Sequence, residues 1–264
     1  GAVRKEGGKM NKTLAFAKRV FIEILRDPLS YIFCLGFPIV MLIVMTLVNQ
    51  SVPPEANMTI FRIDNLAGGI AFFGLTFVML FTSISIAKDR SGAFLARLYA
   101  TPMKSGNFIA GYTLPMLLLG VIQAVITFAA SFIVSLTTNV QMNVLGMISA
   151  IISLIPTMIL MVSFGLFFGT LFNEKSAPGL CSIIISLGSF LGSVWFDAEG
   201  AGGVMFDICN VLPFYHGVKA ARMATALDFS GDFFVHLLIT AGYAVVVLAL
   251  SIVAFKKKMR ADLQ

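Results

Sequence analysis

Long apolar runs alternate with short charged connections along the chain. Six runs contain no Asp, Glu, Lys or Arg, and each is close to the roughly 20 residues that an α-helix needs to cross the hydrocarbon core of a bilayer. They cover about residues 29–49, 69–87, 107–136, 144–172, 178–196 and 233–255. This pattern predicts an all-α polytopic membrane protein with six transmembrane helices.

A different periodicity precedes the first run. In "NKTLAFAKRVFIEILRDP", residues 11–28, apolar and charged side chains fall on opposite faces of a helix. We expect an amphipathic helix in the interface plane of the membrane, with a cytoplasmic extension of the first span as the alternative. It should end at Asp27-Pro28, because the residue before proline avoids the α region. We expect residues 1–10 to be a tail or an expression remnant ahead of a single transmembrane domain at 11–264.

The longest connection, residues 197–232, is too apolar for an exposed loop. It opens with "DAEGAGG" and continues with "FDICNVLPFYHGVKAAR". Pro213 suits the first turn of a helix. We expect a short re-entrant outer hairpin between spans 5 and 6 that returns at Pro213 and lines a cavity, because non-helical backbone at that depth must be covered by protein or water.

Composition and charge support the membrane assignment and orient the chain. Only 12% of the residues are charged and the mean hydropathy is +0.92, whereas soluble domains carry about 25% charged residues. The net charge of +6 could suggest nucleic acid, but sixteen of the Lys and Arg residues fall on one side of the predicted spans and three on the other. By the positive-inside rule, both termini and the connection at 88–106 are cytoplasmic, and we expect no nucleic-acid partner.

Enzyme chemistry has no support in the sequence. The three cysteines, Cys34, Cys181 and Cys209, lack the spacing of a metal or disulfide framework and are interpreted as packing residues. No cluster of metal-ligand spacing and no G-x-S-x-G motif occurs. The one Gly-Lys pair, Gly8-Lys9, is followed by methionine, so the chain lacks a P-loop. We therefore predict no ATPase site, no metal and no cofactor bound by this chain.

Small residues recur at four-residue spacing in two spans. Such spacing in an apolar helix favours close helix packing. The positions are Gly165 and Gly169 in the fourth span, and Gly188 and Gly192, with Ser189 and Ser193, in the fifth. The second face could serve either internal packing or contact with a second copy.

The connection "AKDRSGAFLARLYATPMKSG", residues 87–106, is basic and amphipathic. A helix over about 89–101 would place Arg90, Phe94, Arg97 and Leu98 on one side. A ridge of this kind suits a groove in a cytoplasmic partner; a helix held on the lipid surface is the alternative.

Two segments resemble the permeases of the ABC type-2 exporter family. The inner connection resembles their first cytoplasmic loop at Arg90, Gly92, Leu95, Arg97, Leu98, Thr101 and Pro102. Asp89 matches a common acidic residue, whereas Ala96 replaces a frequent glutamate. "LPFYHGVKAAR" resembles the family's outer signature at Leu212, Pro213, Phe214, His216, Ala221 and Arg222.

The resemblance implies a mechanism and partners. In this family the first cytoplasmic loop is a coupling helix that binds in a groove of a separate ATP-hydrolysing subunit, which holds the ATP and Mg. It implies two permeases, identical or paralogous, with two ATPase copies, in the lipid of a bacterial or archaeal plasma membrane. The implied coupling residues are Asp89, Arg90, Gly92, Phe94, Arg97, Leu98, Thr101 and Pro102, with a minor contact at Glu174 and Lys175.

We interpret the residues of this outer segment, Leu212, Pro213, Phe214, His216 and Arg222, as an outer gate, in which Pro213 has a structural role. His216 is expected to be the most exposed histidine. It could form a cationic gate with Lys219 and Arg222; we favour packing of His216 against Tyr215 and Phe214, with the two cations solvated.

The function expected from the resemblance is outward transport of an amphiphilic or hydrophobic substrate. One alternative is an ion-coupled secondary transporter. Such carriers commonly hold an ionisable residue near the bilayer midplane, where this chain offers only Gln123 and hydroxyl side chains. The other alternative is a membrane sensor or assembly subunit without transport.

Overall fold

The computed structural model describes the backbone of residues 2–92, 94–100 and 103–261, and the side chains of these ranges from Lys12 onward, except those of Ala96, Leu98 and Tyr99. Every regular element in this part of the chain is helical. The elements are α1 (Ala2–Arg26), α2 (Pro28–Tyr31), a π-helical turn (Ile32–Gly36), α3 (Phe37–Ser51), a 3-10 turn (Pro54–Ala56), α4 (Ile63–Ser91), α5 (Phe94–Tyr99), α6 (Ser105–Ser135), α7 (Val144–Ser153), α8 (Ile155–Leu171), α9 (Ala177–Ile183), a second π-helical turn (Ile184–Gly188), α10 (Ser189–Leu191), α11 (Ala198–Ala201), α12 (Gly203–Val211), α13 (Pro213–Thr225) and α14 (Gly231–Ala261).

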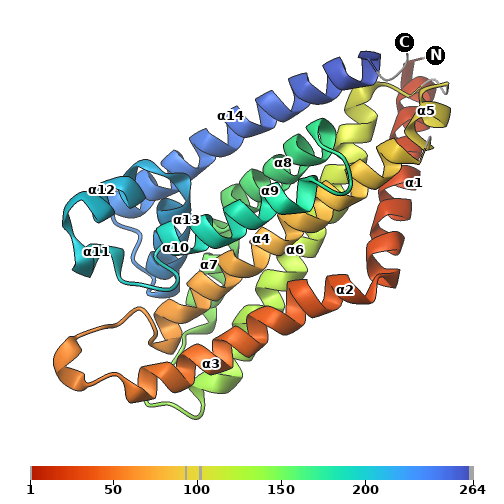
Figure 1. The fold of residues 1–264 in the computed structure, drawn as a ribbon. Helices are drawn as coiled ribbons and strands as arrows, with labels where there is room; N and C mark the ends of the chain where they lie inside the picture. Colours follow the sequence, from red (N-terminus) through yellow and green to blue (C-terminus); the bar gives the residue numbers. More distant parts are fainter. Residues whose placement is uncertain (1, 93, 101–102, 262–264) are drawn as a thin grey trace.

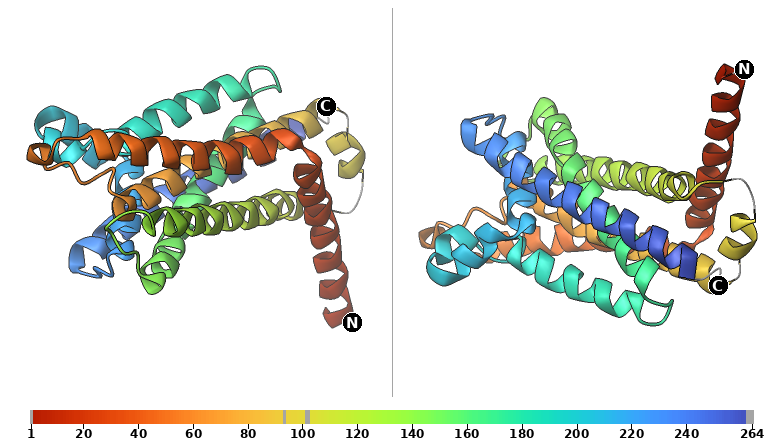
Figure 2. Two further views of the ribbon diagram at one scale, coloured as in Figure 1. Left: turned by 90° about the horizontal axis from the view of Figure 1, so that it is seen from below. Right: turned by 90° about the horizontal axis from the view of Figure 1, so that it is seen from above.

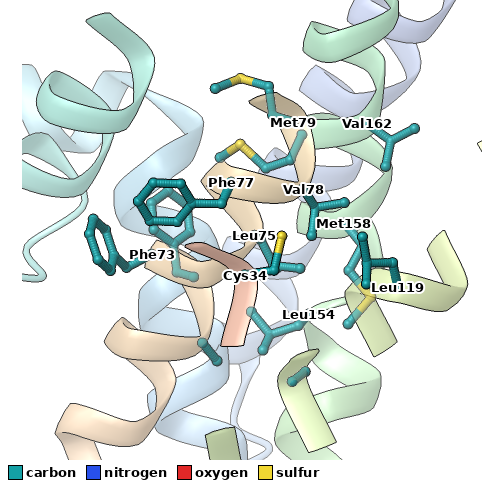
Figure 3. Packing of buried hydrophobic residues seen from close by; sticks show 14 of the residues in the cluster. Cys34, Phe73, Leu75, Phe77, Val78, Met79, Leu119, Leu154, Met158 and Val162 are labelled. Carbon is teal, nitrogen blue, oxygen red and sulfur yellow. The ribbon is translucent and has the colours of Figure 1, made fainter. Parts of the chain in front are cut away.

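Helix α4 forms the centre of the bundle (Figure 1). It is buried without interruption from Leu66 to Met79, and α3, α6, α8, α9 and α13 pack around it. Figure 3 shows Leu75 and Val78 of α4 close to Met158 of α8 and Leu119 of α6. A helix that is apolar on all its faces is stable only when surrounded in this way, by protein or lipid.

Five helical segments are long and apolar enough to cross a membrane: 28–51, 63–91, 105–135, 144–171 and 231–261. They confirm the all-α polytopic fold. The fifth predicted span, 178–196, is shorter than expected: it is the apolar helix Ala177–Leu191. It ends there because the chain turns at Ser193, which has a left-handed φ of 59° and whose hydroxyl donates to the Phe196 carbonyl at 2.9 Å.

Proline shapes two of the long segments. The helix over 144–171 divides into α7 and α8 at Leu154, because Pro156 has no N–H for the carbonyl four residues earlier. At the start of the first span, Asp27 caps α2 by accepting from the Leu29 amide at 3.0 Å, and Pro28 is its first residue. The predicted helix boundary at Asp27-Pro28 is therefore confirmed.

Helix α1 crosses the end of the bundle rather than running along it (Figure 2). Its residues Phe16, Val20 and Ile24 are buried against the bundle, where α1 packs on α6. The contact is close because Gly111 has no side chain: a Cβ there would lie 2.2 Å from the Phe16 ring. The helix begins at Ala2 and so extends through the residues predicted to be a tail.

The two ends of the bundle carry different connections. Both termini, α5 and the turn between α8 and α9 lie at one end, which we call the basic end (Figure 1). The connection after α3, the connection after α6 and helices α11 and α12 lie at the opposite end. This arrangement places the two predicted groups of connections at separate ends.

Candidate functional site

The basic end is organised around the buried carboxylate of Asp89, in the last turns of α4. Arg19 of α1 donates through Nη1 to Oδ2 at 3.0 Å and through Nη2 to Oδ1 at 2.9 Å. The Tyr112 hydroxyl of α6 donates to Oδ2 at 2.6 Å. Bidentate, charge-assisted hydrogen bonds are among the strongest in proteins. Three helices therefore meet at one carboxylate.

Apolar packing positions the arginine. The Phe16 ring packs edge-on against Tyr112 and Phe108, at centroid distances of 5.0 and 5.6 Å. Arg19 follows Phe16 by almost one helical turn and therefore lies on the same side of α1. The docking of Phe16 at Gly111 thus brings the guanidinium to Asp89.

The same guanidinium reaches α5. Its Cζ atom lies 3.7 Å from the centroid of the Phe94 ring, within the range of a cation–π interaction. Burial would lower the pKa of Arg19, but Asp89, and Glu23 at 2.8 Å, raise the pKa above its usual value. The side chain remains charged, and it links α1 to the first residue of α5. We call Arg19, Asp89, Phe94 and Tyr112 the Asp89 cluster.

The prediction of one helix over about 89–101 is wrong. Helix α4 continues to Ser91, where the Gly92 amide donates to the Lys88 carbonyl at 3.0 Å, and α5 begins at Phe94. Arg90 consequently does not share a helical face with Phe94, Arg97 and Leu98. The local signal for this break in the sequence was Gly92, because glycine commonly follows the last turn of a helix.

Arg90 contacts α8 instead. Its Nη1 donates to the carbonyls of Gly169 at 3.0 Å and Phe172 at 3.3 Å. These carbonyls belong to the C-terminal end of α8, where a cation is favourable. Arg90 therefore ties the end of α4 to the turn that carries Glu174 and Lys175.

The predicted coupling residues differ in accessibility. Arg97, Gly92, Glu174 and Lys175 are exposed, whereas Asp89 is buried and Phe94 is half-buried. Leu98 lies in α5, but its side chain is outside the described residues, as are Thr101 and Pro102. The exposed surface available to a partner at these positions is thus formed by α5 and by the turn after α8.

The glycines of α8 pack directly on α4. A Cβ at Gly165 would lie 2.5 Å from the Met79 carbonyl oxygen, and one at Gly169 would lie 2.5 Å from that of Ser83. Because these contacts are with backbone, neither can be relieved by a side-chain movement. The two helices approach closely along the half that leads to Arg90.

The glycines near α10, Gly188 and Gly192, pack against other residues of this chain rather than facing outward. The nearest atom to a Cβ at Gly188 belongs to Phe214, at 3.5 Å, and a Cβ at Gly192 would meet the Gly188 carbonyl at 2.6 Å. Both glycines are buried, as are Ser189 and Ser193. In this chain the small-residue face lies beneath α13.

Helix α13 closes the opposite end of the bundle. It starts at Pro213, the first helical residue as predicted, and is buried from Pro213 to Val218. The Phe214 ring lies 6.2 Å from Phe72 of α4 and 6.4 Å from Phe164 of α8, while Leu212 is half-buried. The helix packs against α4, α7 and α14.

Arg222 holds α13 to two other segments. Its Nε donates to the Asn65 carbonyl at 3.0 Å and its Nη2 to the Ser193 carbonyl at 2.8 Å. Burial lowers the pKa of Arg222 to about 10, so the side chain stays charged near neutral pH. The favoured interpretation of Arg222 as a merely solvated cation is wrong, because its guanidinium is bonded to these carbonyls.

A polar cavity of about 250 Å³ lies beside Arg222. Glu199 accepts from Lys219 and, at 2.6 Å, from the Tyr215 hydroxyl. Burial would raise the pKa of Glu199, but these two hydrogen bonds outweigh it and lower the pKa. Lys219 is therefore paired rather than free.

His216 is buried, contrary to the prediction that it is the most exposed histidine. It is 2% exposed, whereas His236 is half-buried. The Nε2 atom of His216 lies 2.7 Å from the Asn210 carbonyl, and its Nδ1 lies 2.6 Å from Nδ1 of His236. The carbonyl requires a proton on Nε2, so in neutral His216 Nδ1 accepts from His236. The pair joins α13 to α14.

Sequence reasoning missed Arg19 and Tyr112. Arg19 is separated from Asp89 by 70 positions and Tyr112 by 23. A cation on an amphipathic helix is ordinarily solvated, and a tyrosine in an apolar run is ordinarily core. Their distinguishing feature in the sequence is Gly111, the small residue beside Tyr112 that admits Phe16.

The architecture defines a class of protein. Long apolar helices surround a buried central helix, the short helix α5 lies at the basic end, and the helices α11 to α13 lie at the opposite end. This is the architecture of a multi-pass membrane protein. The chain belongs to the ABC-2 type transporter family, whose sequence profile matches residues 11–226. A search of curated proteins found no match.

Membership of this family indicates what kind of domain the matched region is and with which partners such domains work. The matched region is a permease domain without an ATPase site of its own, and such domains generally work with an ATPase partner and often dimerise. The protein is therefore an ABC transporter membrane subunit.

Proposed function

We propose that the chain is the permease subunit of an ATP-driven exporter. A separate ATPase subunit binds ATP and Mg and contacts α5, and the permease moves an amphiphilic or hydrophobic substrate outward. Two ATPase copies and a second permease, identical or paralogous, complete the transporter. The Lys and Arg distribution supports a cytoplasmic location for the basic end, in a bacterial or archaeal plasma membrane.

The Asp89 cluster carries the proposal. Phe94 begins α5 and contacts Arg19, which is bonded to Asp89 at the end of α4. Tyr112, near the start of α6, shares that carboxylate. A displacement of α5 by a partner would therefore be transmitted through these contacts to α1, α4 and α6 together.

The second inner connection would move with the first. Helices α4 and α8 are in backbone contact at Gly165 and Gly169, and Arg90 bonds the end of α8. The turn carrying Glu174 and Lys175 is thus attached to α4. Asn173 orders this turn, because its Oδ1 accepts from the amides of Lys175 and Ser176 at 3.1 and 2.9 Å.

The side chains of the spans support the proposed substrate class. The spans offer Phe, Met, Ser and Thr but no carboxylate or cation in their central parts. Such surfaces suit molecules with a large apolar portion. Closure of the opposite end by α13, held by Arg222 and Phe214, supports a gate that must move for release.

The proposal is tested by reversing the charge at Arg97, which is exposed on α5. The permease is coexpressed with its ATPase subunit, and copurification and ATP hydrolysis are measured. Loss of one partner of a charge pair that is buried at an interface typically costs about 2–5 kcal/mol. If the ATPase covers Arg97, Arg97→Glu should therefore lower ATPase recovery by about tenfold or more.

The matched control is Lys12→Glu, which reverses the charge of an exposed side chain on α1 and should retain the ATPase. Normal copurification and normal hydrolysis with Arg97→Glu would contradict the assignment of α5 as the ATPase contact.

A further inference from the structure

A second cationic feature lies at the basic end, away from the exposed face of α5. The last turns of α14 pass beside the start of α6 (Figure 1). A cavity of about 480 Å³ lies between them. Its lining residues are Lys104, Ser105, Gly106, Asn107, Lys256, Met259 and Arg260.

Three cations from two segments line this cavity. Lys256 and Arg260 are four residues apart on α14 and so lie on the same side of that helix; Lys104 immediately precedes α6. No carboxylate lines the cavity, and no ion pair of these three side chains occurs among the described residues. Their mutual repulsion is unfavourable, and an anion between them would relieve it.

The N-terminal end of α6 also favours an anion, through its backbone amides rather than through a charged side chain. Lys104 is extended, and no side chain caps the first turn. The first amides of a helix lack intrahelical partners and favour an anion. Above Gly106 the space is open, since a Cβ there would meet no atom within 4 Å.

The position of the cavity selects the source of the anion. Helices α6 and α14 both belong to the segments able to cross a membrane, and the cavity lies at the ends of both. The lining also includes an apolar side chain, Met259 of α14. An occupant with an anionic head and an apolar tail would place its charge in the cavity and its tail beside the apolar parts of these two helices.

We propose that the cavity between α6 and α14 binds the phosphate headgroup of an anionic phospholipid in the leaflet at the basic end. Lysine and arginine together suit phosphate, since arginine can bond two oxygens and lysine supplies a point charge. Because Lys104 ends the connection that carries α5, the bound headgroup would hold that connection against α14. The binding itself does not depend on the proposed transport function.

The test measures lipid binding by the purified permease. Native mass spectrometry counts bound phosphatidylglycerol and phosphatidylcholine at graded lipid concentrations. The test variant combines Lys104→Gln, Lys256→Gln and Arg260→Gln. Each cation near a membrane surface contributes about fivefold to the binding of anionic lipid, so the triple variant should bind phosphatidylglycerol about a hundredfold more weakly, with phosphatidylcholine unchanged.

The matched control removes three exposed cations from other elements at the same end, through Lys12→Gln, Lys18→Gln and Lys88→Gln. It should retain phosphatidylglycerol. Equal loss in both triple variants, or equal binding of the two lipids by wild type, would overturn the site. Displacement of phosphatidylglycerol by millimolar inorganic phosphate would overturn the lipid assignment and show a site for free phosphate. Thermal unfolding in phosphatidylcholine checks that each variant is folded.

Discussion

At the residue scale, the carboxylate of Asp89 joins three helices, α1, α4 and α6. Its carboxylate receives three hydrogen bonds from α1 and α6, and it is 6% exposed. A buried carboxylate is stable only when paired. The acidic position that the family resemblance assigns to ATPase contact is therefore turned inward, where it positions the elements around α5.

The first prediction concerns this carboxylate. Asp89→Asn keeps the volume but removes the charge that Arg19 pairs with. Because Arg19 remains 30% exposed, water replaces part of the lost interaction, and we expect unfolding free energy to fall by about 1–3 kcal/mol. Thermal unfolding of the purified permease measures it.

Glu23→Gln is the matched control, because it removes the other carboxylate that Arg19 contacts. That side chain is 54% exposed, and the change should stay within about 0.5 kcal/mol. Equal destabilisation by the two variants would show that the buried Asp89 carboxylate stabilises the fold no more than the exposed Glu23 carboxylate does.

At the element scale, the contact between α4 and α8 depends on missing side chains. Gly165 and Gly169 each place α8 against carbonyl oxygens of α4. In membranes, close backbone approach stabilises helix pairs without a hydrophobic driving force. The same principle docks α1 on α6 at Gly111 and α7 on α13 at Gly146, where a Cβ would lie 2.1 Å from the Thr225 carbonyl.

The second prediction separates α4 from α8. Gly169→Ala introduces a Cβ 2.5 Å from a backbone oxygen, so the helices must move apart. Overpacking of this kind typically costs about 1–3 kcal/mol, and the thermal unfolding temperature should decrease. Gly242→Ala, in α14 with no atom within 4 Å of the new Cβ, should not lower it. A stable Gly169→Ala protein would mean that the close approach is dispensable.

At the scale of the whole molecule, the two ends of the bundle differ in charge. Sixteen of the nineteen Lys and Arg residues fall in the connections and tails predicted to be cytoplasmic, and the termini, α5 and the turn after α8 share one end of the structure. The positive-inside rule concerns such short connections. Charge and topology therefore favour one orientation of the whole chain.

The third prediction tests that orientation in intact cells. Asn139→Cys, in the exposed connection after α6, should react with an impermeant thiol reagent added outside, whereas Lys18→Cys on α1 should react only after permeabilisation. Cys34, Cys181 and Cys209 are buried, so the background should be low. The reverse labelling pattern would refute the orientation.

The sequence by itself determined the properties that depend on a few adjacent residues. Apolar length predicted the spans, proline predicted the boundaries at Asp27-Pro28 and Pro213, and two short segments predicted the family. Periodicity could not show where α4 ends, because the apolar and basic pattern continues across Gly92; the glycine alone marked the break.

Only the tertiary structure decided which distant groups meet. Arg19 and Asp89 are 70 positions apart, and Arg222 and the Asn65 carbonyl are 157 apart. Their contacts depend on how helices cross, and crossing is set by side-chain shape at points such as Phe16 and Gly111. A local pattern predicts which face of a helix is apolar, but the partner of each side chain on that face follows from the packing of the whole bundle.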